Sequence, residues 1–269
     1  MMSELKRILV TATMSSGKST LVNAFIGQQI MMAQNESCTS LPWVITEDPE
    51  SSKPYGRHNR MRITFKQNIA AVLHELTNET VPIFTPMYRT EADVIWQLID
   101  TPGVNSSTDM EHKRLAESYV REMDYDVLLY VVNGGHLGTQ DDEMHLCFIQ
   151  QVVPSQKIIF VMNKVDQFRK GHDSIQDSVV TLKNRLHEFG FIDPIVQPVS
   201  ARAGYLFKRE LQQSELSEEE IDELEWYKRK FAREGFDLSE NKASMSSTLL
   251  DQCGLHALEK LIKRKEVCK

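Results

Sequence analysis

The chain has 269 residues, long enough to bury a full hydrophobic core, and its formal net charge is −7. This acidic balance argues against general nucleic-acid binding, because affinity for a phosphate backbone needs a basic face. The four cysteines stand far apart without a C-x-x-C pair, so we expect neither a zinc site nor a disulfide framework. No run of about 18 apolar residues and no signal-peptide core occur, which predicts a cytoplasmic protein with at most peripheral membrane contact.

The first readable unit, from Arg7 to Gly27, is an apolar strand, a tight loop and an amphipathic helix that Gly27 can cap. Its loop reads ATMSSGKST, with Ala12 where the usual pattern has a glycine. The N–H groups of such a loop and the positive end of the helix dipole favour an anion at one point. A chance Gly-Lys-Ser in a loop is the alternative, but strand, loop and helix occur in the order that a phosphate-binding loop requires.

Within this loop, Gly17 lets the backbone approach the phosphates, Lys18 reaches the β and γ oxygens, and Ser19 offers a hydroxyl to Mg²⁺. The predicted nucleotide-binding residues of this segment are Ser15, Ser16, Gly17, Lys18, Ser19 and Thr20.

The next segment, from Ile30 to Thr46, is expected to be a loop that leads into an edge strand. Nucleotide switches place here a threonine that closes over Mg²⁺ and the γ-phosphate, and Thr39 is our candidate. Ser40 and Thr46 are weaker candidates, and a threonine in a solvated turn is the alternative.

The residue pattern of the stretch 47–93 indicates its secondary structure least clearly. We expect a strand at MRITF and a helix at NIAAVLHELTN. Its arginines, Arg57, Arg60 and Arg62, fit a solvated strand flank better than an arginine finger.

From Val94 to Gly103 an apolar strand ends in the letters DTPG. Asp100 can hold Mg²⁺ through a water, and the N–H of Gly103 can meet the γ-phosphate, because ligands bind at strand ends in α/β folds. Val104 stands where many switches carry a glutamine that orients the attacking water, so hydrolysis must rely on other groups.

Helices and strands then alternate. The predicted helices span 109–124, 140–151 and 175–189, and the predicted strands span 126–133, 157–162 and 195–201. The G-x-x-G pattern from Gly134 to Gly138 has no basic surroundings and is interpreted as a turn rather than a nucleic-acid-binding loop.

The letters NKVD follow the strand 157–162 and form the second strong signal. The carboxylate of Asp166 accepts hydrogen bonds only, which matches the paired N–H donors of guanine and not adenine, so an ATPase is disfavoured. Asn163 can secure the loop and meet the base, while the stem of Lys164 can lie along the ring. After the last strand, a backbone N–H of Ser200, Ala201 or Arg202 is placed to meet the guanine oxygen.

The remainder is helical and charged. The stretch 206–236 is acidic first and basic later, as the helix dipole favours, and Leu224, Tyr227 and Phe231 form a packing stripe. A polar linker at 237–247 precedes an amphipathic closing helix at 254–265. We expect a GTPase core over 1–204 and a helical extension packed on it over 205–269.

Repeated strand–loop–helix units predict an α/β fold of three layers, the P-loop NTPase fold, with a mostly parallel central sheet flanked by helices and with C-terminal helical additions. The four loop motifs gather at the carboxyl ends of the strands and predict a guanine-nucleotide site. The expected reaction is in-line attack of water on the γ-phosphorus of GTP, giving GDP and phosphate, with Lys18, the loop N–H groups and Mg²⁺ stabilising the transferring group.

Together, the motifs resemble the translation-factor-related class of P-loop GTPases, and within it the bacterial dynamin-like GTPases. The specific pointers are the letters SSGKST, the long interval before DTPG, the apolar Val104, the run VSARAGYLFKREL and the closing GLHALEKLI.

This resemblance implies that Ser15 helps to bind a monovalent cation, Na⁺ or K⁺, and positions the catalytic water. It implies that Thr39 closes over Mg²⁺ and this water, which makes Ser15, Lys18, Thr39 and Gly103 the predicted catalytic residues and Ser19, Thr39 and Asp100 the predicted metal site. It also implies a nucleotide-dependent homodimer that speeds hydrolysis, and peripheral membrane association through regions outside this chain. The alternatives are an Era-like GTPase, for which no basic RNA-binding domain is visible, and a slow GTP-dependent switch that recruits a partner.

Overall fold

The structure, a computed structural model, describes residues 4–12, 15–31, 42–58, 61–64, 80–89, 93–101, 110–135, 140–169, 171–233, 235–239 and 248–265. These residues form a nine-stranded sheet in the order β4-β3-β5-β2-β6-β1-β7-β8-β9. The strands are β1 Leu5–Ala12, β2 Trp43–Glu47, β3 Tyr55–His58, β4 Met61–Thr64, β5 Ile83–Thr85, β6 Ile95–Asp100, β7 Val127–Asn133, β8 Ile158–Asn163 and β9 Val196–Pro198.

The five strands from β6 to β9 are parallel, and β2 and β5 are parallel to each other. The other pairings, β2 with β6, β5 with β3 and β3 with β4, are antiparallel. The central strands β7 and β8 are almost entirely apolar because helices cover both faces of the sheet. The predicted α/β fold with a mostly parallel sheet is confirmed.

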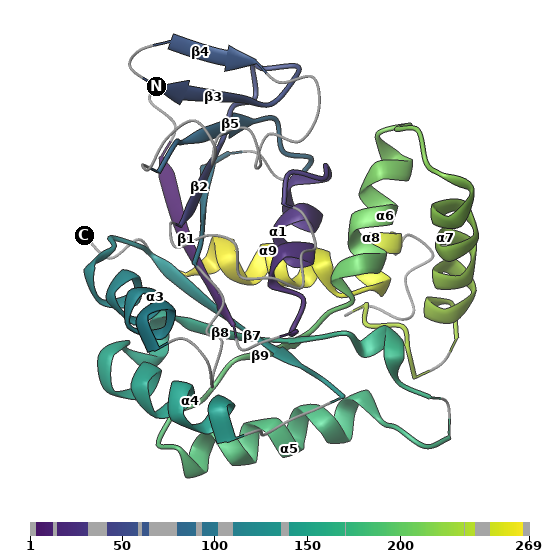
Figure 1. Cartoon of the computed structure of the whole chain (residues 1–269). Helices are drawn as coiled ribbons and strands as arrows, with labels where there is room; N and C mark the ends of the chain where they lie inside the picture. The colour runs from purple at the N-terminus through teal and green to yellow at the C-terminus, as the bar shows by residue number, and fades with distance from the viewer. Residues whose placement is uncertain are drawn as a thin grey trace.

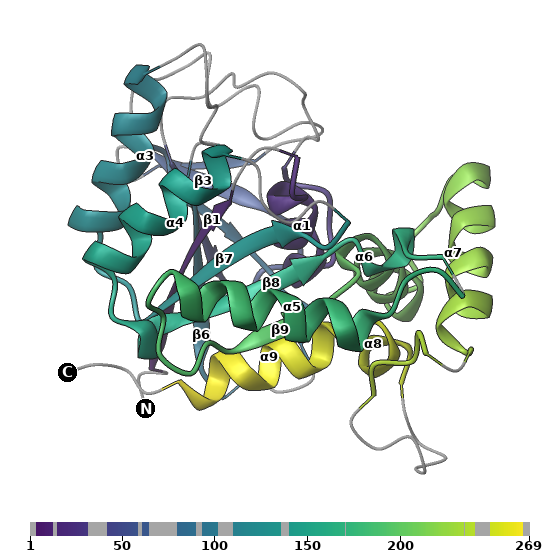
Figure 2. The same ribbon diagram turned by 90° about the horizontal axis from the view of Figure 1, so that it is seen from below.

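Helices cover both faces of this sheet. They are α1 Lys18–Ile26, α3 Met110–Glu122, α4 Gln140–Val152, α5 Ile175–Glu188, α6 Ala201–Leu211, α7 Glu218–Phe231, α8 Leu249–Gln252 and α9 Leu255–Arg264. Figure 1 shows α3, α4 and α5 on one face and α1, α6 and α9 on the other. Helix α7 lies on the outer side of α6 in both views (Figures 1 and 2). None of the described helices is long and apolar enough to cross a bilayer.

A buried ion pair joins three helices on the α1 face. The ammonium group of Lys208, in α6, is fully buried and contacts Glu259 Oε1 of α9 at 2.7 Å. The same group donates to the carbonyl oxygen of Phe25 at 2.9 Å, in the last turn of α1. Helix α1 ends at Ile26 and is followed by Gly27, whose φ of 78° confirms the predicted cap. Because α1 begins at the phosphate-loop lysine, this contact fixes the far end of the helix on which that loop depends.

Two features differ from what the sequence predicts. The strand expected at the edge is β2, which lies inside the sheet between β5 and β6, so that prediction is wrong. The stretch 47–93 adds β5, β3 and β4 beyond it. Strands β3 and β5 were not expected, because they are too short to show an alternation of apolar and polar side chains. The helical stretch expected over 206–236 is two helices, α6 and α7, with a break at 212–217.

Other predictions lie outside the described residues or stay open. The helix expected at NIAAVLHELTN and most of the linker at 237–247 are outside them. The proposed boundary at 204–205 falls within α6, and the division of the chain there stays a prediction.

Candidate nucleotide-binding site

The four predicted loops meet at one edge of the sheet. Strand β1 leads to the phosphate loop, β6 ends at Asp100, β8 leads to Asn163–Lys164 and β9 leads to Ser200. Because these strands run parallel, their carboxyl ends lie side by side, which is where open α/β sheets bind ligands.

The phosphate loop requires glycine at position 17. Gly17 has a φ of 87°, and a Cβ there would lie 2.5 Å from Nδ2 of Asn163. Ser15 also adopts a left-handed conformation, with a φ of 58°. Left-handed residues beside a helix start turn successive N–H groups toward one point, which makes an anion-binding concavity. Ser19 and Thr20 lie in the first turn of α1, directly after Lys18.

Lys18 and Asp100 are in direct contact. The lysine ammonium lies 2.6 Å from Asp100 Oδ1 and 2.6 Å from the carbonyl oxygen of Thr101. Burial raises the pKa of Asp100, and the charge of Lys18 acts in the opposite direction. The site thus brings the ammonium group at the start of α1 together with the carboxylate at the end of β6.

Asn163 cross-links three of the loops. Its Nδ2 donates to the carbonyl oxygen of Ser16 at 2.8 Å, and its Oδ1 accepts from the N–H of Ala201 at 3.0 Å. Its own carbonyl oxygen accepts from the N–H of Gly134 at 2.8 Å. The Asn163 side chain is buried, so both ends of its amide are used inside the protein. Asn163 was predicted to secure the loop and to meet the base, and these hydrogen bonds do the first of the two.

Lys164 and Asp166 contact two of the loops that Asn163 joins. Lys164 is left-handed, with a φ of 64°, and its Cε lies 3.7 Å from where a Cβ of Gly17 would be. Asp166 Oδ1 accepts from the hydroxyl of Ser200 at 2.6 Å. Burial raises the pKa of Asp166, and this hydrogen bond opposes the effect. The lysine stem therefore lies beside Gly17 of the phosphate loop, while the carboxylate is held by the loop after β9.

Arg202 turns toward α7. Its guanidinium donates to Glu223 Oε2 through Nε at 2.9 Å and through Nη2 at 2.6 Å. Glu223 also accepts from the hydroxyl of Tyr227 at 2.9 Å. Tyr227 is buried, as the predicted packing stripe requires, but its contact with Glu223 and the contact of Glu223 with Arg202 were not expected, because packing of α7 on the loop after β9 is encoded by no local motif.

A buried polar group beneath the phosphate loop was also missed. Thr11 Oγ1 lies 3.3 Å from Nε2 of His145, in α4, and the ring of His145 packs against Tyr130 with centroids 5.3 Å apart. All three side chains are buried. A histidine in a helix carries no signal by itself, so only the fold reveals this contact.

Several candidates lie elsewhere or outside the described residues. Thr39, Ser40, Gly103, Val104 and Arg60 are outside them. Thr46 lies within β2, where its hydroxyl accepts from Gln97 at 3.0 Å. The arginines at 57 and 62 stack on Phe84 and Tyr55 of the outer strands. Among the described residues, no group of three or more His, Cys, Asp or Glu side chains could hold a metal.

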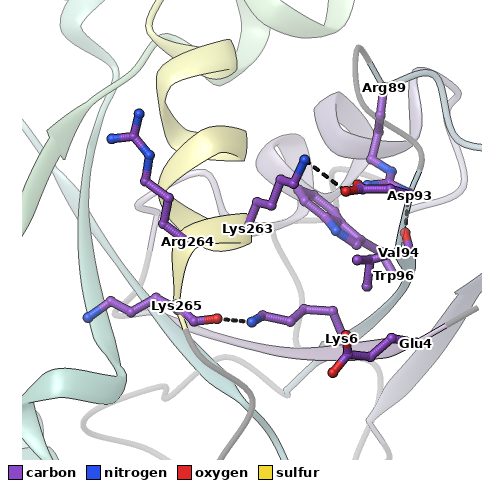
Figure 3. A pocket seen from close by; sticks show the side chains of 9 residues that line it. All are labelled: Glu4, Lys6, Arg89, Asp93, Val94, Trp96, Lys263, Arg264 and Lys265. Carbon is purple, nitrogen blue, oxygen red and sulfur yellow. Dashed lines mark hydrogen bonds and ion pairs between the residues drawn. The ribbon is translucent and has the colours of Figure 1, made fainter.

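A cavity of about 360 Å³ lies at the other end of the sheet (Figure 3). It lies between the starts of β1 and β6 and the end of α9, where Lys263 pairs with Asp93 at 2.8 Å. The ammonium group of Lys6 donates to the carbonyl oxygen of Lys265 in the same cavity. Its place at the amino ends of the strands separates it from the four loops.

The fold and the loops at the carboxyl edge of the sheet define the class of P-loop GTPase domains. The model of the Dynamin family matches residues 8–165, more than half of the chain. The chain therefore belongs to the dynamin family, which confirms the resemblance drawn from the sequence. A search of the curated proteins found no match.

Solved structures support the fold. Two structures of an oligomerised bacterial dynamin pair that senses and tethers membranes are 16% and 18% identical to this chain, with TM-scores of 0.53 and 0.54. Each match covers 97% of this chain and 40% of the solved chain. Era from Aquifex aeolicus, with GDP and aluminium fluoride bound, is 18% identical over 80% of this chain and 58% of its own, and its TM-score of 0.43 is too low to inform the fold. This chain thus spans less than two thirds of each.

Proposed function

We propose that this chain binds GTP with Mg²⁺ and hydrolyses it to GDP and phosphate. The observation that carries the proposal is the cross-link by Asn163, which joins the phosphate loop, the NKVD loop and the loop after β9 in one buried arrangement. Such a link is what a site for both the phosphates and the base of one nucleotide requires. The Dynamin family match favours this branch over the Era-like alternative.

The phosphates and the metal are assigned to the region around Lys18. Ser19 offers a hydroxyl and Asp100 a carboxylate, and hard oxygen ligands of this kind fit Mg²⁺, which keeps several waters of its own. When bound, the metal neutralises charge on the phosphate oxygens. Lys18, now in contact with Asp100, is within reach of the same region and would exchange this carboxylate for phosphate oxygens.

The guanine is assigned to Asp166, with the stem of Lys164 along one face of the ring. Ser200 holds Asp166 in place, and a backbone N–H at 200–202 is proposed to meet the guanine oxygen. The N–H of Ser200 already donates to the carbonyl oxygen of Cys253, and that of Ala201 donates to Asn163, so the N–H of Arg202 is the better candidate of the three.

The catalytic water is assigned to Ser15, Thr39 and Gly103, with Na⁺ or K⁺ beside Ser15. This part of the proposal depends on the family likeness, as do the nucleotide-dependent homodimer, the cytoplasmic location and any peripheral membrane association. Ser15 supports it by its position in the phosphate loop, two residues before Gly17, where it is exposed and has a left-handed conformation.

The test of base recognition is the exchange of Asp166 for asparagine. Asp166→Asn keeps an oxygen for the Ser200 hydroxyl, so the fold is expected to be retained, but its amide group presents donors to guanine. We expect GDP affinity to fall by about tenfold or more and xanthosine diphosphate affinity to rise, because a hydrogen bond to a charged group is worth about 1.5–3 kcal/mol. Asp193→Asn is the control, since Asp193 is exposed and its positive φ suits asparagine. Unchanged GDP affinity in Asp166→Asn would remove the guanine assignment.

A further inference from the structure

A second cavity lies between α7 and residues 166–169, which include the last residue of the NKVD loop and the three residues after it. Its volume is about 690 Å³, within the range of roughly 300–1,000 Å³ that small-molecule sites occupy. It is lined by Asp166, but by none of the phosphate-loop residues and by neither Lys164 nor Ser200. It is therefore a neighbour of the predicted guanine site that shares one wall with it.

The charge of this cavity is unbalanced. Four cations line it: Arg169, Arg229, Lys230 and Arg233. Its two carboxylates already have other hydrogen-bond partners, because Asp166 accepts from the Ser200 hydroxyl and Glu223 accepts from Arg202 and Tyr227.

The hydrogen bonds that the structure shows for the side chains of these cations go to backbone oxygens. Lys230 donates to the carbonyl oxygen of Phe168 at 2.7 Å, and Arg229 donates to that of Glu225 at 3.1 Å. Within the described part of the chain, none of the four cations of the cavity forms an ion pair with a carboxylate. Burial lowers the pKa of Lys230, so its positive charge is costly there, and a bound anion would offset that cost.

Aromatic side chains form most of the rest of the wall, which also includes Gln167. The Lys230 ammonium lies 4.9 Å from the centre of the Trp226 ring and 4.4 Å from that of Phe236. Trp226 packs edge to face on Tyr227, with centroids 5.0 Å apart, yet 45% of its surface is exposed. An exposed indole beside these cations can stack on the planar ring of a ligand while the guanidinium groups bind the ligand's phosphates.

We propose that this cavity binds a small phosphorylated ligand that carries a planar ring, at a site separate from the guanine site. The helix that lines this cavity, α7, carries Glu218, Glu219 and Asp222 in its first half, and this acidic stretch disfavours a long polyanion such as RNA. The ligand is thus a small molecule whose phosphates lie on the arginines and whose ring lies on Trp226.

The test uses ATP as the probe, because the guanine loop is expected to reject adenine. The full chain is saturated with GDP and Mg²⁺, and ATP binding is measured by equilibrium dialysis. We expect one ATP per chain, and at least tenfold weaker binding in the double variant Arg229→Glu with Arg233→Glu. The matched control is Arg114→Glu with Lys183→Glu, which reverses two charges on α3 and α5, across the sheet, and is expected to leave ATP binding unchanged.

The ring is tested separately. Trp226→Ala is expected to weaken ATP at least threefold and to leave inorganic tripolyphosphate unchanged. The proposal is overturned if GDP-saturated protein binds no ATP, or if the double variant binds it as tightly as the natural chain. Equal binding of ATP by natural chain and Trp226→Ala would overturn the stacking contact. If GDP itself fails to bind, the proposed GTPase function fails. The proposal for this cavity is then tested by ATP binding to the natural chain and to the double variant without GDP.

Discussion

Asn163 is the residue on which the arrangement of the loops depends most. It is 2% exposed, and its amide makes the two hydrogen bonds that join Ser16 to Ala201. In Asn163→Ala both partners lose their bond, and a buried polar group left unpaired costs about 1–3 kcal/mol. The variant is therefore expected to lose about 2–6 kcal/mol of unfolding free energy, as well as nucleotide affinity.

The assay is urea denaturation of the natural chain and of the variant, followed by circular dichroism, with GDP affinity measured on the folded protein. Asn184→Ala is the matched control: Asn184 is an exposed asparagine of α5, and its removal is expected to change stability by no more than about 0.5 kcal/mol. A loss below about 1 kcal/mol in Asn163→Ala, with GDP affinity unchanged, would refute the view that this side chain holds the loops together.

Two further predictions concern α1 and the catalytic water. Lys208→Met leaves Glu259 buried and unpaired, so denaturation should show a loss of about 3–5 kcal/mol, and adding Glu259→Leu should recover much of it. Additive losses in the double variant would contradict a coupled pair. Ser15→Ala should leave GDP binding unchanged but lower GTP turnover in a phosphate-release assay. Full turnover in that variant would remove the proposed catalytic role of Ser15.

The local motifs could be predicted from the sequence because each is written in consecutive residues. The phosphate loop depends on the glycine at 17 and its helix, and the apolar runs of β7 and β8 signal buried strands directly. The gathering of the loops at one edge follows from parallel strands alone.

What the sequence did not reveal depends on distant partners. The interior position of β2 is set by short strands from the stretch 47–93. Two of them, β3 and β5, have only four and three residues, which are too few to show an alternation of apolar and polar side chains. Lys208 stands in a charged stretch and looks exposed, yet Glu259 and the end of α1 surround it in the fold. A helix start at 201 could have been found, because Ser200 caps it and is a residue type that favours that position.

The central claim, GTP hydrolysis by a dynamin-family domain, is tested most directly by the rate of phosphate release as a function of protein concentration. The assay contains GTP and Mg²⁺ with Na⁺, K⁺ or a bulky inert cation, and Lys18→Ala serves as the blank. We predict specific activity that rises with protein concentration and is highest in Na⁺ or K⁺. A rate no higher than that of Lys18→Ala at every concentration, with GTP still bound by the natural chain, would contradict the account and favour a switch that only recruits a partner.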